Sequence, residues 1–177
     1  AVFGFGAKAG VLPLQVTALG AAYYVGNCHK WLCAPKGAAF LHVRADRQAD
    51  LRPLVLSYGA NSTRTDRARF HLEFDWTGTR DFSGWLAVPE ALNFFRQLGP
   101  VRARSYTHNL VIQKAKELSN AWNTPLDGPS QLHGSMMAIR LPERLQRRDP
   151  RQLMQEWVTR HRLVAAVMPV DGTLSVR

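Results

Sequence analysis

The chain has 177 residues, a formal net charge of +10 and a hydrophobic content of 46%, and only 20% of its residues are charged. This composition predicts a globular protein with a core and excludes a disordered chain, which would combine low hydrophobicity with high charge. The basic surplus favours anionic partners such as nucleic acid, acidic lipids or a phosphorylated cofactor. Neither an aromatic-interleaved RNA motif nor a helix-turn-helix pattern accompanies it, so we expect no nucleic-acid partner.

The two cysteines, Cys28 and Cys33, are too few for a disulfide framework. With His29 between them they do not form a zinc pattern, because a fourth ligand is missing. We therefore expect reduced thiols, no bound metal and a cytoplasmic location. The uncharged segment 9–27 is interrupted by Pro13 and Gly20, so it is interpreted as a connecting helix and strand, and we expect no membrane partner.

The first predicted elements surround a lysine. Tyr23–Val25 and Ala38–Val43 have strand character, and their short link predicts an antiparallel pair at one edge of a larger α/β sheet. Between them lie Asn27, His29 and Lys30. A lysine directly after a buried strand and beside a histidine suits Schiff-base chemistry with an aldehyde cofactor, or phosphate binding. A solvated loop lysine is the alternative.

The segments around this pair contain turns and one further strand. Leu14–Leu19 is predicted to form a short helical turn that Gly20 closes. Leu54–Ser57 is predicted as a strand, and Gly59–Arg69 as an exposed polar loop. The glycine-rich stretch 4–10 lacks the spacing of a phosphate-binding loop.

A turn of small polar residues, Thr77-Gly78-Thr79, precedes the first long helix. Its hydroxyls and backbone N–H groups lie next to Arg80, and Asp81 or Ser83 can cap the helix that follows. Such a cluster suits an anionic group. A capped turn without a ligand is the alternative.

Two helices follow, from about Phe82 to Leu98, with a second part that begins at Pro89, and from about Val101 to Trp122. Gly99-Pro100 separates them. The first helix carries the apolar residues Leu86, Leu92, Phe94 and Phe95. In the second, one apolar stripe is most simply interpreted as core: Tyr106, Leu110, Ile112, Ala115 and Leu118.

The last third of the chain has an α+β pattern after a linker at Trp122–Gly134. The predicted elements are a strand at Ser135–Leu141, a helix at Pro150–Arg162 capped by Asp149, and strands at Leu163–Val167 and Leu174–Arg177. We therefore predict two domains, residues 1–100 and 101–177, with residues 101–122 as the connecting helix.

Three stretches together carry a family resemblance: GNCHKWLCAPKGAAFL (26–41), FDWTGTRDFSGWLAVPEAL (74–92) and SVR (175–177). With them the sequence resembles the class V aminotransferase superfamily of pyridoxal-phosphate enzymes, in particular the isopenicillin N epimerase-like branch. The likeness covers only the C-terminal half of the family's usual length, and we expect a fragment. It implies an α/β fold, in which part of a fold-type-I large domain (1–100) precedes a truncated small α+β domain (101–177).

The resemblance implies a role for five residues. Lys30 would form the Schiff base with the pyridoxal 5'-phosphate aldehyde and later move the substrate α-proton. His29 and Asn27 would contact the cofactor phosphate. Thr79 would reach the phosphate of the neighbouring subunit's cofactor, which implies a homodimer with shared active sites. Arg177 would bind the α-carboxylate of an amino acid substrate, a task that suits a planar guanidinium fork.

The sequence departs from the family at the ring nitrogen of the cofactor. Relatives carry an Asp-x-Ala-His or Gln segment there, and its carboxylate makes the ring an electron sink. The corresponding positions are Gly4 and Ala7, which cannot do this. Between Leu163 and Arg177 there is also no thiol, so persulfide transfer is disfavoured.

The sequence leaves three functions open. The first is an epimerase, lyase or transaminase that acts on an amino acid. The second is a truncated, catalytically inactive fragment or pseudoenzyme that serves at most as a binding or dimerisation partner. The third is nucleic-acid binding through the +10 charge.

Overall fold

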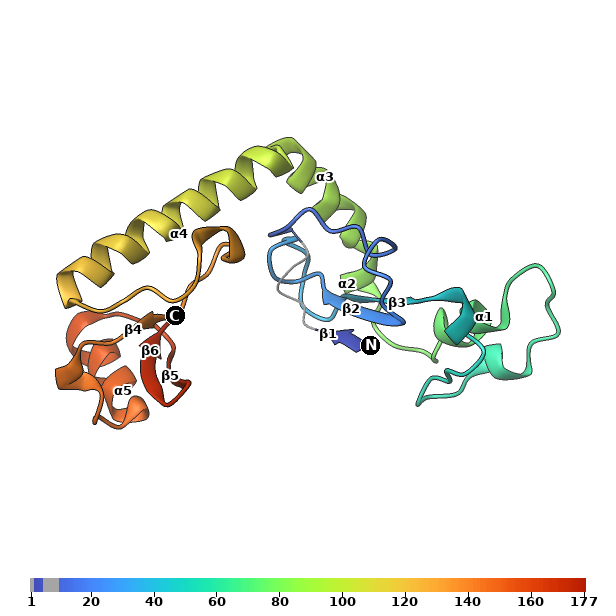
Figure 1. The fold of residues 1–177 in the computed structure, drawn as a ribbon. Coiled ribbons are helices and arrows are strands. Elements are labelled where there is room, and N and C mark those ends of the chain that lie inside the picture. Colours follow the sequence, from blue (N-terminus) through green and yellow to red (C-terminus); the bar gives the residue numbers. More distant parts are fainter. Residues whose placement is uncertain (1, 5–9) are drawn as a thin grey trace. The chain divides into compact units, whose positions relative to one another are not determined.

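The computed structural model describes residues 2–4 and 10–177. The chain divides into two compact units, Ala1–Pro100 (unit 1) and Val101–Arg177 (unit 2), whose elements are labelled in Figure 1. The assignment of these units to a cofactor domain and a small domain stays a prediction.

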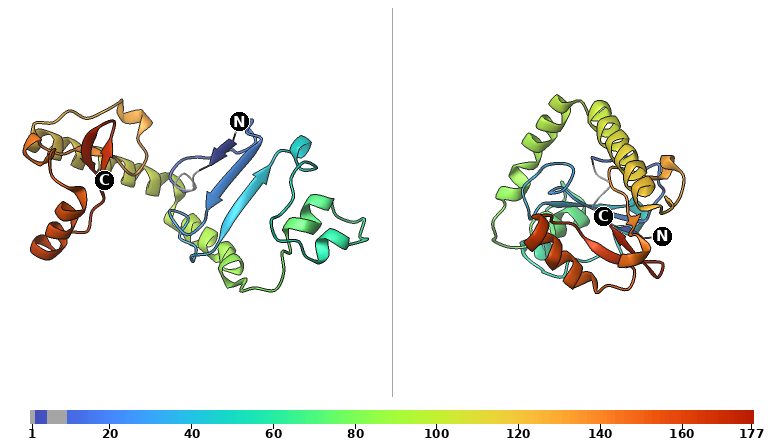
Figure 2. Two further views of the ribbon diagram at one scale, coloured as in Figure 1. Left: turned by 90° about the horizontal axis from the view of Figure 1, so that it is seen from below. Right: turned by 90° about the vertical axis from the view of Figure 1, so that its left-hand side faces the viewer.

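A three-stranded sheet organises unit 1 (Figure 2, left). Its strands are β1 (Val2–Gly4), β2 (Tyr23–Asn27) and β3 (Ala39–Val43), in the order β1-β2-β3. β1 pairs with β2 in parallel, and β2 pairs with β3 in antiparallel register from Tyr23↔Val43 to Asn27↔Ala39. The predicted antiparallel pair is therefore confirmed.

One face of β2 is buried by an aromatic stack. Tyr24 is 3% exposed, and its ring lies 5.9 Å from that of Phe40 on β3. Gly26 is the cross-strand partner of Phe40, and a Cβ atom there would collide with the Phe40 ring. The absence of a side chain at Gly26 is what allows the aromatic ring to cover the strand.

Helical segments complete unit 1: η1 (Ala45–Arg47), η2 (Tyr58–Asn61), α1 (Arg69–Phe74), α2 (Ser83–Leu86) and α3 (Val88–Leu98). The predicted division of the long helix at Pro89 is confirmed, because α2 ends at Leu86 and α3 starts at Val88. Ala91 of α3 packs with three buried small residues from the β2–β3 connection, Cys28, Ala34 and Ala38.

Several predictions for unit 1 are wrong. Leu54–Ser57 is not a strand: Leu54 is fully exposed, and no strand pairs with the segment in the described part of the chain. Helix α1 was not predicted. Of the apolar residues that the sequence places on the first long helix, Leu86 and Phe94 are exposed by 77% and 49%, whereas Phe95 is buried.

Unit 2 contains the long helix α4 (Pro100–Trp122), which was predicted, and a second three-stranded sheet. The sheet runs in the order β4 (Ile139–Arg140), β6 (Thr173–Val176) and β5 (Val167–Val170), with antiparallel neighbours. The remaining segments are η3 (Ser130–Leu132), η4 (Glu143–Leu145) and α5 (Pro150–His161).

Helix α5 begins as its sequence predicts. The Asp149 side chain accepts a hydrogen bond of 2.8 Å from the Gln152 backbone N–H, and Pro150 occupies the first turn. The helix ends at His161, one residue before the predicted end, and Arg162 follows as its C-cap with a left-handed backbone (φ 52°). Inside, Leu153 is 2% exposed and packs with Leu141, Val167 and Leu174.

Three details of unit 2 differ from the predictions. The strand predicted for Ser135–Leu141 is limited to Ile139–Arg140, and the one predicted for Leu163–Val167 begins only at Val167. On α4 the predicted core stripe is only half right, because Ala115 is fully buried but three of its members are exposed. These exposed residues are Tyr106, Leu110 and Leu118.

No helix in residues 2–4 and 10–177 has the length and apolar character needed to cross a membrane. Within the same residues, no group of three His, Cys, Asp or Glu side chains could hold a metal ion, and both cysteines are free.

Candidate active site

The loop that carries the predicted lysine, residues 28–34, is closed by backbone hydrogen bonds at its base and is called the lysine loop here. The Cys28 N–H donates to the Ala38 carbonyl at 3.0 Å, and the Cys28 carbonyl accepts from the Ala34 N–H at 3.0 Å. Inside it, the Cys33 N–H donates to the Lys30 carbonyl at 3.1 Å, and Cys33 adopts a φ of 64°. Lys30 therefore lies on a defined loop at the end of β2.

The side chains of this loop divide into exposed and covered groups. Lys30 is exposed, whereas His29 and Asn27 are half-buried. The His29 Nδ1 atom is buried and has no hydrogen-bond partner. A covered ring nitrogen without a partner is unusual in a folded protein, because the lost hydration is not replaced.

Cys28 anchors the lysine loop and is unsuited to nucleophilic chemistry. It is 4% exposed and packs in the small-residue cluster, and burial raises the pKa of its thiol above the ordinary value of 9.0. The other cysteine, Cys33, is exposed. Because a thiolate is the reactive form, we assign Cys28 a packing role.

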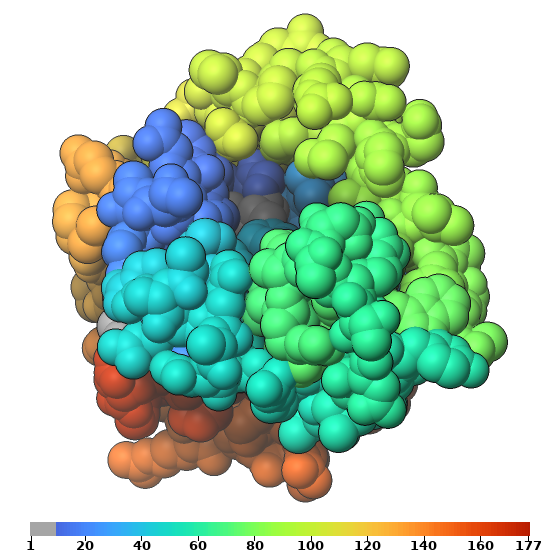
Figure 3. Space-filling model, turned by 90° about the vertical axis from the view of Figure 1, so that its right-hand side faces the viewer, coloured from blue at the N-terminus to red at the C-terminus, as the bar shows by residue number. Residues whose placement is uncertain are grey.

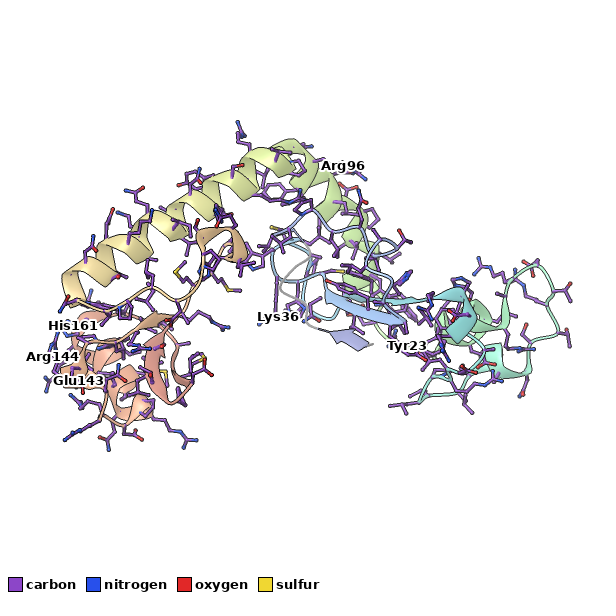
Figure 4. All side chains as sticks on the ribbon, viewed as in Figure 1. Tyr23, Lys36, Arg96, Glu143, Arg144 and His161 are labelled. Atoms are coloured by element: carbon purple, nitrogen blue, oxygen red, sulfur yellow. The ribbon has the colours of Figure 1, made fainter. Side chains whose placement is uncertain are left out.

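The lysine loop follows the carboxyl end of β2, and the parallel strand β1 ends at the same edge of the sheet. In Figure 4, Tyr23 marks the first residue of β2, and Lys36 marks the short segment between the lysine loop and β3. The carboxyl edge of parallel strands is the usual ligand-binding edge of α/β sheets. Gly4, the last residue of β1, has no side chain to offer there, and Ala7 lies outside the described residues.

Thr79 lies in the same unit, in the turn before α2, and is exposed. Gly78 has a φ of 109°, a backbone conformation that favours glycine in this turn. The Asp81 carboxylate accepts a hydrogen bond of 2.8 Å from the Ser83 N–H. Hydrogen bonds from the side chain and backbone of Ser83 lower the pKa of Asp81. The ionised form of this carboxylate is therefore the one that caps the start of α2.

Two aromatic rings lie against Arg80, the residue that follows this turn. The Arg80 guanidinium lies 4.6 Å from the centroid of Trp85 and 5.5 Å from that of Phe82. The first turn of α2 also lies close to the β2–β3 connection, since a Cβ at Gly84 would be 3.2 Å from the Lys36 carbonyl oxygen. Helix α2 therefore packs against the chain segment between the lysine loop and β3.

A hollow of about 630 Å³ is lined by residues of β3, of the segment 53–55, of α1 and of the stretch 75–85. Figure 3 views unit 1 from the side of the cyan and green segments. The lining of the hollow is largely apolar, including Leu41, Phe70 and Trp85, and it includes Thr77 and Arg80. Lys30 is not part of this lining. The hollow is thus lined in part by Thr77 and Arg80, and no residue of the lysine loop lines it.

Arg177 belongs to unit 2 and continues the ladder of β6. Its N–H donates to the Ala166 carbonyl at 2.9 Å, and the Ala166 N–H donates to its carbonyl at 3.3 Å. The structure thus brings Lys30, His29 and Asn27 together, and places Thr79 elsewhere in unit 1 and Arg177 in the other unit.

Arg140 on β4 was not considered in the sequence analysis. Its Nε atom is buried without a hydrogen-bond partner. The available signal was the charge inside the apolar run SMMAIRL.

Comparisons with known proteins place these features in context. The family model described as Aminotransferase class-V matches residues 6–157. The chain is 37% identical over 137 residues to the putative L-cysteine desulfhydrase 1 of Oryza sativa subsp. japonica, which covers 75% of this chain and 27% of that protein. It is 38% identical over 151 residues to the isopenicillin N epimerase of Amycolatopsis lactamdurans, over 77% of this chain and 37% of the relative.

Two solved structures share the fold. An apo cysteine desulfurase from Thermococcus onnurineus NA1 matches 99% of this chain and 46% of its own, with a TM-score of 0.75 and 14% identity. A variant of the C-DES enzyme, with glycine covalently linked to its PLP cofactor, matches 96% of this chain and 44% of its own, with a TM-score of 0.65 and 20% identity. The chain therefore spans less than half the length of each of these proteins.

Proposed function

The chain belongs to the class-V aminotransferase family, and on this premise we propose that it is the lysine-bearing part of a pyridoxal phosphate enzyme that acts on an amino acid. Within the family we assign it to the isopenicillin N epimerase-like branch, with epimerase, lyase or transaminase chemistry. The observation that carries the proposal is the lysine loop, where an exposed Lys30 follows a histidine whose buried Nδ1 has no partner.

The donors on the phosphate side of the site fit the cofactor. The uncompensated His29 Nδ1 and the Asn27 amide, at the carboxyl end of β2, can bind phosphate oxygens. The small side chains beneath them, Cys28, Ala34 and Ala38, hold the loop in place without adding charge. Charge-assisted hydrogen bonds of this kind are stronger than those between neutral groups.

When bound, the cofactor supplies an aldehyde that condenses with amines and a ring that withdraws electrons. The Lys30 amine then accepts the proton that leaves the substrate α-carbon and returns it to a carbon atom. The closed base of the lysine loop restricts where this amine can reach, which favours proton transfer at one position.

The remaining roles complete a shared site. Arg177 binds the α-carboxylate of the substrate through two parallel N–H···O bonds. Thr79 binds the cofactor phosphate of a second subunit, so the active assembly is a homodimer. The exposure of both side chains in the single chain supports these roles, since each is free to meet a ligand or a partner.

A second candidate function is cofactor binding without turnover, in a pseudoenzyme that acts through dimerisation. The specific observation in its favour is Gly4 at the end of β1, where relatives place the carboxylate that binds the ring nitrogen. Neither Gly4 nor Ala7 can replace that charge, so stabilisation of the substrate carbanion would be weak.

Cofactor binding is tested by titration of the purified chain with pyridoxal 5'-phosphate, followed by borohydride reduction and peptide mapping. We expect a visible absorbance band and a reduced adduct on the peptide that contains Lys30. Lys30→Ala should abolish both, and Lys36→Ala, an exposed lysine nearby, should leave both unchanged. An adduct that forms equally in Lys30→Ala would overturn the proposal.

The two candidate functions differ in the fate of the substrate α-proton. Exchange of this proton with deuterated water, followed by NMR on a mixture of amino acids, reports turnover directly. Exchange that requires Lys30 supports the enzyme. Formation of the Lys30 adduct with no exchange above the cofactor-only rate supports the second candidate.

A further inference from the structure

Arg140 and Arg177 lie on the same face of the unit 2 sheet. Arg140 of β4 pairs directly with Ser175 of β6, so their side chains share a face. Arg177 is two residues beyond Ser175 and continues the same ladder through its hydrogen bonds with Ala166. Successive side chains of a strand alternate, which places the side chain of Arg177 on the face of Ser175 as well.

The opposite face of this sheet is the core of unit 2. Ile139 and Val176, which pair with each other, both pack in the hydrophobic cluster around Ala115, and Val176 also contacts the cluster around Leu153. The face of Arg140 and Arg177 is therefore the one turned away from this core.

Two cations close together on one face require an explanation. Diagonal cross-strand neighbours such as Arg140 and Arg177 have Cβ atoms about 7 Å apart, and like charges at this range repel each other. No ion pair to either arginine occurs within residues 2–4 and 10–177, although Glu156 of the same unit pairs with both Arg148 and Arg160. The pair thus has no acidic partner on the described chain.

The surroundings of Arg140 are those of a binding group, not of a solvated side chain. Arg140 is half-buried and its Nε is covered without an acceptor, while Ser175 beside it is 5% exposed. A covered guanidinium N–H without an acceptor is unfavourable, and a carboxylate that binds the guanidinium offsets this cost. Residues 2–4 and 10–177 supply no such group to Arg140, so a ligand is the source that we consider.

From these observations we propose that Arg140 binds a second carboxylate of the substrate, beside the α-carboxylate that Arg177 binds. The inference rests on the proposed function, because it assigns the substrate class of the same site: amino acids that carry an additional carboxylate on the side chain. One guanidinium fork satisfies both oxygens of one carboxylate, so two forks on one face match two such groups.

The test measures binding without the cofactor, by calorimetric titration of the full chain with glutarate, a dicarboxylate, and with pentanoate, a monocarboxylate of equal length. We expect glutarate to bind about tenfold or more tightly, the effect of one added charged hydrogen-bonded pair. Arg140→Gln should lower the glutarate affinity to that of pentanoate and leave the pentanoate affinity unchanged. Arg177→Gln should weaken both.

The matched control is Arg147→Gln, which removes the same charge at an exposed position of unit 2 and should leave both affinities unchanged. Arg140→Lys, which retains the charge but not the planar fork, should lose most of the glutarate preference while its circular dichroism spectrum stays that of the parent. Equal affinities for the two acids, or an Arg140→Gln effect on both acids alike, would overturn the proposal.

The outcome is independent of cofactor binding. A glutarate preference that depends on Arg140, in a chain that forms no Lys30 adduct, would retain the anion site and overturn the proposed function. An adduct at Lys30 in a chain that shows no glutarate preference would support the proposed function and overturn the second carboxylate site.

Discussion

Unit 1 and unit 2 are stabilised in different ways. The core of unit 2 contains large side chains, with Leu141 and Leu153 almost fully buried and Trp122 and Trp157 packed against them. The cluster under the lysine loop consists of Cys28 and three alanines. Both units also leave large apolar side chains exposed, among them Leu54 and Tyr58 in unit 1 and Leu132 and Val164 in unit 2.

This difference shows what holds the lysine loop in place. In unit 2 the volume of the side chains determines how the helices meet the sheet. In unit 1 close backbone approaches do this: the Phe40 ring covers Gly26, and α2 meets the Lys36 carbonyl at Gly84. The opposed pair Val25 and Leu41 on β2 and β3 is left 43% and 40% exposed. The position of the lysine loop therefore depends more on these close backbone approaches than on the apolar area that unit 1 buries.

The largest expected effect comes from the core of unit 2. Leu153→Ala removes a side chain that is 2% exposed and leaves a cavity, so we expect the free energy of unfolding to fall by about 2–5 kcal/mol. Urea denaturation followed by circular dichroism measures this loss. Val158→Ala on the same helix, at a position that is 43% exposed, is the control and should cost less than about 1 kcal/mol. Similar losses for the two variants would contradict the assigned core.

A smaller effect is expected from Gly26→Ala in unit 1. The added Cβ collides with the Phe40 ring, and overpacking of this kind costs about 1–3 kcal/mol. We also expect weaker cofactor binding, because Gly26 directly precedes Asn27 at the site. A double variant that adds Phe40→Leu should recover most of the lost stability. Without such recovery, the collision is not the cause.

The smallest effect concerns pH. Burial raises the pKa of Cys28 in the folded chain above its ordinary value of 9.0. Because the folded pKa is the higher one, the stabilisation is fully present below pH 9.0 and is lost as the pH rises through the folded pKa. We expect the unfolding free energy of the parent to fall in this alkaline range more than that of Cys28→Ala.

Labelling with a thiol reagent at pH 8 gives an independent check of the same assignment. The exposed Cys33 should react at least about tenfold faster than the buried Cys28, as mass spectrometry of the two peptides can show. Equal rates would mean that the lysine loop opens readily and that its small-residue core does not hold it.

Local signals in the sequence were sufficient where chemistry and pattern agreed. The Asp149-Pro150 start of α5 predicted the cap that the structure shows, since both residues act on the backbone next to them. The strand pair β2–β3 was predicted for a similar reason, because a short link between two apolar runs favours an antiparallel pair. The roles of Lys30, His29, Asn27, Thr79 and Arg177 are still predictions.

Predictions failed where the outcome depends on a distant partner. The apolar run at Leu54–Ser57 has strand character, but a strand needs a neighbour, and none pairs with it in the part of the chain described. On α4, Leu110 and Val111 are adjacent apolar residues, and only packing against Met137 and Ile139 decides that Val111 faces the core. The sequence did not indicate a role for Arg140, because the residues beside it, Ser175 and Arg177, come close to it only when β4 pairs with β6 in the folded sheet.

The approach of α2 and α3 to the lysine loop has a consequence for biosynthesis. Lys30 is translated well before Gly84 and Ala91, the residues that pack against the β2–β3 connection from α2 and α3. Long-range contacts form late, because the intervening chain must first be closed into a loop. During synthesis Lys30 therefore leaves the ribosome before the helices that support its loop, and we expect it to reach its final position only after these helices have been made.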